Sequence, residues 1–90
     1  MQQDNIERTK FNKAVGAVVK KIRKNTDKSI NKFALEYDID RGNLSRLERG
    51  SINCRMFTAW KISEASGIKF SEFAKLLENE LGENFKIYDD

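Results

Sequence analysis

The sequence contains no histidine and no proline, a single cysteine and only five glycines in 90 residues. Without histidine there is no imidazole base, and the carboxylates do not cluster around a serine, threonine or cysteine that could act as a nucleophile. One cysteine without histidine also removes most ways to build a zinc site. We therefore expect a protein that is not an enzyme and that holds no metal and no cofactor.

Long apolar runs are missing as well. No stretch approaches the roughly 18–20 residues that span a bilayer, and residues 1–5 do not begin a signal-peptide pattern. Cys54 can form no internal disulfide, which is typical of a reducing compartment. These features predict a cytoplasmic protein that is neither secreted nor inserted in a membrane.

The absence of proline and the scarcity of glycine favour helices. Apolar residues recur at spacings of three and four, as at Val15, Val18 and Ile22, which is typical of one helix face. The length suits one domain, since domains usually have about 100–150 residues. We expect an all-α, five-helix domain over residues 1–82, with helices at 7–24, 30–37, 41–49, 56–66 and 70–81. In the fourth helix, Met56, Ala59 and Ile62 are expected inside. For the tail, residues 83–90, a short strand and a loose segment both remain open.

Positive charge is concentrated in the middle of the chain. The net charge is +3, but residues 13–55 hold eleven basic and five acidic residues, a net of +6, whereas residues 56–90 have a net of −3. This asymmetry indicates one face for a polyanion and another for a different partner. A solvated surface of mixed charge is the alternative.

Residues 29–50 carry the informative pattern, two short helices separated by a break at 38–40. Ser29 and Asp40 are suited to cap the two helices, Asp40 by accepting from the N–H of Asn43 or its neighbour. Leu44 and Leu47 are three apart and are expected inside. Six residues then face outward: Arg41, Gly42, Asn43, Ser45, Arg46 and Arg49. Such a helix fits the DNA major groove, where arginine pairs with guanine and asparagine with adenine.

This segment resembles the helix-turn-helix of lambda-repressor-like (Xre-type) DNA-binding domains. Residues 15–23 resemble the first helix of that family, residues 48–50 the end of its recognition helix, and residues 67–73 its turn into the fifth helix. Three residues depart from the pattern. Asp38 replaces a common glycine in the turn, Ile30 replaces a glutamine that touches phosphate, and Lys28 replaces an apolar residue, so a looser loop is expected at 26–28.

The resemblance implies a sequence-specific regulator from a bacterium or phage, a repressor or autoregulator that binds double-stranded DNA as a homodimer on a pseudopalindromic operator. It implies base contacts by Arg41, Gly42, Asn43 and Arg46. For each of these residues, contact with phosphate is the alternative. Phosphate contacts are implied for Asn31, Lys32, Ser45 and Arg49. An ion pair between the first and third helices is implied for Arg23 and Glu48.

Apolar residues beyond the minimal domain, together with Trp60 in the fourth helix, predict a dimer or partner surface. Its residues are Trp60, Leu77, Leu81, Phe85 and Ile87. For Trp60 the alternative is that it covers the rim of the core. Pairing through the last helices would give a two-fold dimer, whereas a tail that folds back would fill its own monomer. The rival function is an antitoxin, with a toxin as partner, or another protein-interaction module that uses the same fold. RNA binding is disfavoured because the aromatic residues lie outside the basic segment.

Overall fold

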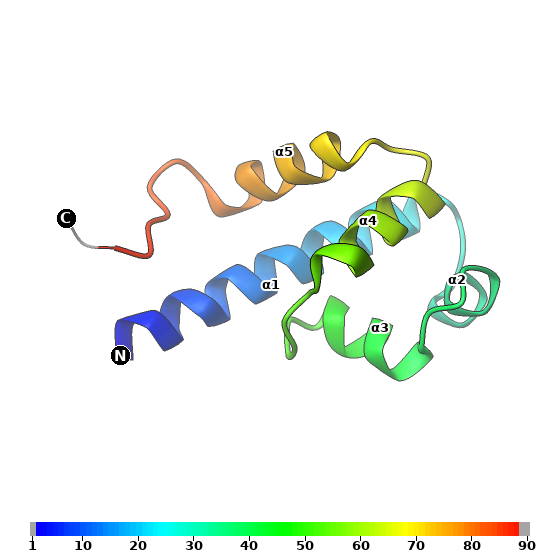
Figure 1. Cartoon of the computed structure of the whole chain (residues 1–90), viewed down its shortest axis with the longest axis horizontal. Coiled ribbons are helices and arrows are strands. Elements are labelled where there is room, and N and C mark those ends of the chain that lie inside the picture. The colour runs from blue at the N-terminus through cyan, green and yellow to red at the C-terminus, as the bar shows by residue number, and fades with distance from the viewer. Residues whose placement is uncertain (1, 89–90) are drawn as a thin grey trace.

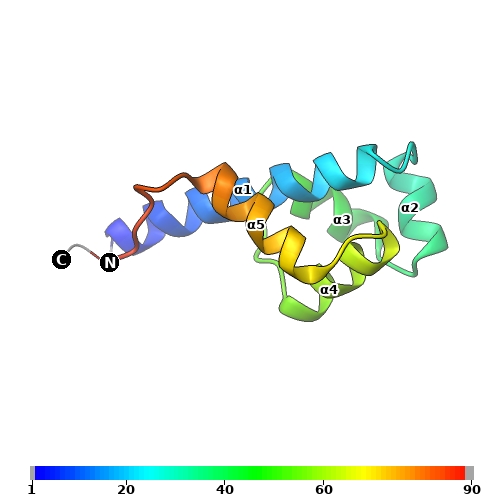
Figure 2. The same ribbon diagram turned by 90° about the horizontal axis from the view of Figure 1, so that it is seen from above.

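The computed structural model describes residues 2–88, with side chains from residue 5 onward, and contains five α-helices. They are α1 (Gln2–Lys24), α2 (Ile30–Glu36), α3 (Arg41–Glu48), α4 (Met56–Ala65) and α5 (Phe70–Leu81). The long helix α1 runs through the molecule, α5 lies alongside it, and α2, α3 and α4 gather around its C-terminal half (Figures 1 and 2). The expected all-α, five-helix fold is therefore confirmed.

The helix boundaries follow from local hydrogen bonds. Ser29 Oγ accepts from the backbone N–H of Lys32 at 3.1 Å, and Asp40 Oδ2 accepts from that of Asn43 at 2.9 Å, so both side chains cap their helices as predicted. Asp38 has a φ of 54°, a left-handed conformation that aspartate tolerates better than most residues. The chain thus reverses tightly between α2 and α3 without the usual glycine.

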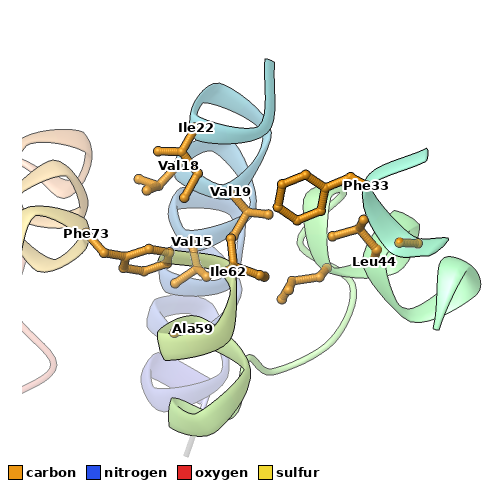
Figure 3. Close-up of a cluster of buried hydrophobic side chains, with 11 residues drawn as sticks. Val15, Val18, Val19, Ile22, Phe33, Leu44, Ala59, Ile62 and Phe73 are labelled. Atoms are coloured by element: carbon orange, nitrogen blue, oxygen red, sulfur yellow. The ribbon is translucent and has the colours of Figure 1, made fainter. Parts of the chain in front are cut away.

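The core lies where α1 meets the other helices (Figure 3). Val19 from α1, Phe33 from α2 and Ile62 from α4 are completely buried, and Phe73 from α5 is 3% exposed. Burying a side chain of this size contributes about 1.5–3 kcal/mol. The same cluster contains Leu44 and Leu47, so it fixes α3 with its opposite face toward solvent.

Glycine allows α1 and α3 to pack closely. A Cβ atom at Gly16 would lie 2.5 Å from the backbone carbonyl oxygens of both Leu47 and Glu48. At Gly50, just after α3, φ is 76° and a Cβ would lie 2.7 Å from Cα of Lys13. The end of α3 therefore rests directly on the backbone of α1.

Three details differ from the expectations. Helix α1 begins at Gln2 rather than near residue 7, because no proline or glycine interrupts the polar segment before the apolar stripe. Met56 is 74% exposed. Each three-residue step turns a helix face by about 60°, so Ala59 and Ile62 face the core while Met56 falls outside that arc. Ser63, 1% exposed, takes the inner place instead and donates to the Ala59 carbonyl at 2.8 Å.

The tail folds back along α1. Its described residues contain a turn and a bend but no strand, and they run beside the N-terminal half of α1 (Figure 2). The rings of Phe85 and Phe11 are 6.2 Å apart between centroids. Residues 89 and 90 of the predicted tail lie outside the described residues.

Candidate nucleic-acid interface

Helix α3 has one apolar and one polar face. Leu44 and Leu47 are 1% and 3% exposed. The exposed polar residues of the helix are Arg41, Asn43 and Arg46, and Arg49, its C-cap residue, is exposed as well. Gly42 and Ser45 are half-buried. The residues expected to touch base edges are thus all at least partly accessible on one helix.

Hydrogen bonds connect the polar side chains of this face. Arg46 Nη2 donates to Asn43 Oδ1 at 2.7 Å, and Arg49 Nη1 donates to Ser45 Oγ at 2.7 Å. Arg41 Nε donates to Asn31 Oδ1, which joins α3 to α2. The expected phosphate ligand Ser45 and the expected base ligand Asn43 therefore both hold an arginine in this structure.

The neighbouring end of α2 adds a smaller polar surface. Asn31 and Lys32 are exposed next to the Ser29 cap. Ile30 is partly buried and packs against the core, so an aliphatic side chain occupies the position where the resemblance leads one to expect a glutamine. On this turn of α2 the exposed side chains that could contact phosphate are therefore Asn31 and Lys32.

Arg23 and Glu48 join α1 to the end of α3. Arg23 Nε donates to Glu48 Oε2 at 2.6 Å and Nη2 donates to Oε1 at 3.0 Å, a bidentate pair. The side chains are 8% and 5% exposed. Arg23 Nη1 also donates to the Lys28 carbonyl at 2.7 Å. One guanidinium therefore connects the loop before α2 to the end of α3.

The loop at residues 26–28 is held in place, which corrects the expectation of a looser one. Lys28 Nζ donates to Glu36 Oε1 at 2.6 Å and to Tyr37 Oη at 2.8 Å, and lies 4.7 Å from the centre of the Tyr37 ring. These two hydrogen bonds raise the pKa of Lys28, the bond to Glu36 more than the bond to Tyr37. The bond between Lys28 and Glu36 also lowers the pKa of Glu36. An ammonium group thus closes the loop at the position where the resemblance leads one to expect an apolar side chain.

The residues expected on a partner surface divide between two regions. Trp60, on α4, is 54% exposed, and its ring stacks on Phe70 with centroids 5.4 Å apart. Leu77 is partly buried against the core. Leu81 and Phe85 are half-buried, and Ile87 is 45% exposed and lines a hollow with Phe11 and Asn12 of α1. The tail residues therefore do not form one continuous surface with Trp60.

Ile87 lines a hollow that also involves Cys54. Phe11 and Asn53 contribute to its walls. Burial raises the pKa of the Cys54 thiol to about 11, so this cysteine is a poor nucleophile near neutral pH. Residues 2–88 contain no group of three or more acidic, histidine or cysteine side chains placed to hold a metal ion. None of the described helices combines the length and apolar character needed to cross a bilayer.

Sequence reasoning missed the close contact made by Gly16. The signal was present, because a glycine inside an apolar helical stripe often marks the approach of another backbone. It also missed the bonds of Lys28, since Glu36 and Tyr37 lie eight and nine residues further on, in no simple helical spacing with it. Both features position α3 or the segment that precedes it.

The comparisons with known proteins define the class. The profile of the Helix-turn-helix family matches residues 19–73, which is more than half of the chain and includes all of α2 and α3. The chain therefore belongs to this family of lambda-repressor-like, Xre-type DNA-binding domains, which are regulators and not enzymes. Among individual proteins, Control protein C.MunI of Mycoplasma sp. is 39% identical over 66 residues, 72% of this chain and 89% of the relative. No solved structure matches the chain.

Proposed function

We propose that this protein is a sequence-specific transcriptional regulator, a repressor or autoregulator that acts as a homodimer on a pseudopalindromic operator in double-stranded DNA. The observation that carries the proposal is the polar face of α3, which exposes three arginines and an asparagine opposite two buried leucines. The net charge of +6 over residues 13–55 supports a polyanionic partner. The matched relative is named a control protein, which favours a regulator over an antitoxin.

The direct test is selection of bound sequences from a pool of random duplexes at about 0.15 M salt, near the physiological value. We expect enrichment of an inverted repeat whose half-sites are separated by about one helical turn of DNA. Binding without enrichment would contradict sequence-specific recognition, and an enriched single half-site would contradict the dimer.

Two alanine substitutions separate base reading from phosphate binding. Arg46→Ala should weaken binding to the selected site by about 1–3 kcal/mol, the range for one good bidentate base contact, with a smaller effect on random DNA. Lys32→Ala should weaken binding to all duplexes alike and reduce the salt dependence by about one phosphate contact. Equal losses on selected and random DNA for Arg46→Ala would assign that side chain to the phosphates.

For the dimer we propose the aromatic face of α4 as the interface. Phe57 is 77% exposed, and Trp60 and Glu64 each line two hollows. One hollow is also lined by Tyr37, Phe57, Lys61 and Ala65, and the other by Ser63, Ile68, Lys69, Phe70 and Ser71. A two-fold interface pairs a surface with itself, so a projecting ring next to a recess is self-complementary.

Sedimentation analysis tests this interface. We expect the wild-type protein to be a dimer and the double variant Phe57→Ser, Trp60→Ser to be a monomer with unchanged helix content. Leu35→Ser is the matched control, because Leu35 is 84% exposed on α2 and lines neither hollow. A monomeric wild-type protein would overturn the homodimer and leave the face to another protein, as the antitoxin alternative requires.

A further inference from the structure

The exposed arginines of α3 and its C-cap, Arg41, Arg46 and Arg49, share one feature, which is that each donates a hydrogen bond to a neutral oxygen. The acceptors are the amide oxygens of Asn31 and Asn43 and the hydroxyl of Ser45. Within residues 2–88, none of the three arginines forms an ion pair. The acids nearest along the chain are engaged elsewhere, since Asp40 caps α3 and Glu48 pairs with Arg23. Each guanidinium is thus held by a hydrogen bond, and within the described part of the chain no ion pair with a carboxylate compensates its positive charge.

Arg46 is held in a defined position over the first turn of α3. Helical side chains lean toward the helix N-terminus. A Cβ atom at Gly42 would lie 3.3 Å from Asp40 Oδ2 and 3.4 Å from both Nη1 and Nη2 of Arg46, so the guanidinium and the capping carboxylate both approach a residue that has no side chain to obstruct them. Asn43 Oδ1 then accepts from Nη2 at 2.7 Å. The arginine head is therefore brought to the end of the helix whose residues read base edges in this class of protein.

A neutral acceptor suits an arginine that must read a base. Guanidinium has five N–H donors, so one bond to Asn43 leaves four, and guanine needs two of them for its O6 and N7 atoms. A carboxylate in the place of Asn43 would hold the same geometry, but its negative charge would repel the phosphates of any duplex. An amide restrains the side chain before binding and so reduces the ordering that binding requires.

We propose that Asn43 and Asn31 are positioning residues, which aim Arg46 and Arg41 at base edges and do not themselves read a base or bind phosphate. This inference rests on the proposed function, because it presumes an operator that the protein recognises. It differs from the assignment by sequence, in which Asn43 contacts a base and Asn31 a phosphate.

The test is a double-mutant cycle measured on every single-base variant of the operator selected by the wild-type protein. Arg46→Ala should lower affinity for the operator about 5- to 140-fold, which corresponds to 1–3 kcal/mol, and should remove the preference at one base pair in each half-site. Asn43→Ala should lower affinity about 3- to 10-fold, the loss of one hydrogen bond, and should relax the preference at that same base pair. The double variant should bind no more weakly than Arg46→Ala.

The opposite pattern would overturn the inference. If Asn43 reads its own base, Asn43→Ala relaxes a different base pair and the two losses multiply. A wild-type protein that enriches no sequence overturns the proposed function and this inference with it, whereas enrichment with multiplying losses overturns the inference alone. The same cycle with Asn31→Ala and Arg41→Ala tests the second pair.

Asn43→Asp provides a matched control. The acceptor oxygen remains in place, so the base preference should stay that of the wild type, while the added negative charge lowers affinity for all duplexes and most strongly at low salt. Loss of the preference in Asn43→Asp, as in Asn43→Ala, would show that the amide N–H₂ group reads the base. Melting temperatures within a few degrees of the wild type exclude a folding defect, because the side chain of Asn43 is exposed.

Discussion

The Arg23–Glu48 ion pair predicts a large effect of one substitution on folding stability. In Glu48→Ala the Arg23 guanidinium, on a residue that is 7% exposed, loses both bonds to the carboxylate and keeps the one to the Lys28 carbonyl at 2.7 Å. Removing one partner of a buried ion pair costs about 3–5 kcal/mol, because the other charge is left without compensation. Because Arg23 keeps its bond to the Lys28 carbonyl, we expect a loss of folding stability at the lower end of this range, about 3 kcal/mol.

The expected loss is a large fraction of the total free energy of unfolding. A chain of this length has a free energy of unfolding of about 5–13 kcal/mol. At about 4–8 °C per kcal/mol, the melting temperature should fall by about 12–24 °C. Urea denaturation followed by circular dichroism at 222 nm, a standard helix signal, measures the change. An unchanged slope would show that unfolding exposes the same surface in the variant as in the wild type.

Two further variants decide whether buried charge is the cause. Glu36→Ala removes the carboxylate of the more exposed pair with Lys28 and should have a much smaller effect, since exposed ion pairs contribute little. The double variant Arg23→Met, Glu48→Leu should recover most of the stability, because apolar side chains can replace a buried pair. The reasoning is refuted if Glu48→Ala is no less stable than Glu36→Ala.

Two other perturbations follow from the structure. Gly16→Ala should destabilise the fold by about 1–3 kcal/mol, because the added Cβ would lie 2.5 Å from two carbonyl oxygens of α3. This effect should outweigh the higher helix propensity of alanine. Urea denaturation measures the change, and a variant as stable as the wild type would contradict the close packing. The pKa of Glu36 is lowered by its bond from Lys28, so the stability that this carboxylate contributes is present above its ordinary pKa of 4.5 and is lost as the pH falls through the lowered value. The stability difference between wild type and Glu36→Gln should therefore shrink below that pH, and a difference that does not shrink as the pH falls would contradict the pair.

Local patterns were enough to predict the fold. Spacings of three and four located all five helices, and the caps Ser29 and Asp40 bond as their positions required. Periodicity was less reliable at the ends. The start of α1 lacks an apolar stripe, and Met56 shares the spacing of Ala59 and Ile62 without sharing their face.

The candidate interface was predictable in its membership but not in its internal contacts. The alternation of leucines with arginines identifies the exposed face of α3 from sequence alone. Which oxygen each arginine bonds depends on rotamers and on the distance between α2 and α3, and no spacing rule specifies the bond between Arg41 and Asn31, ten residues apart. The partners of Lys28 depend in the same way on how the loop folds.

Stability and recognition are connected in this protein through the end of α3. Glu48 pairs with Arg23, its backbone oxygen lies over Gly16, and Gly50 rests on Lys13, so three contacts fix the direction in which α3 leaves α1. A substitution that separates these helices would tilt the polar face as well as weaken the core. Glu48→Ala should therefore reduce discrimination between operator and random DNA even at temperatures where the protein stays folded. The double variant Arg23→Met, Glu48→Leu should restore stability more completely than discrimination, because apolar packing replaces the ion pair without its directional bonds.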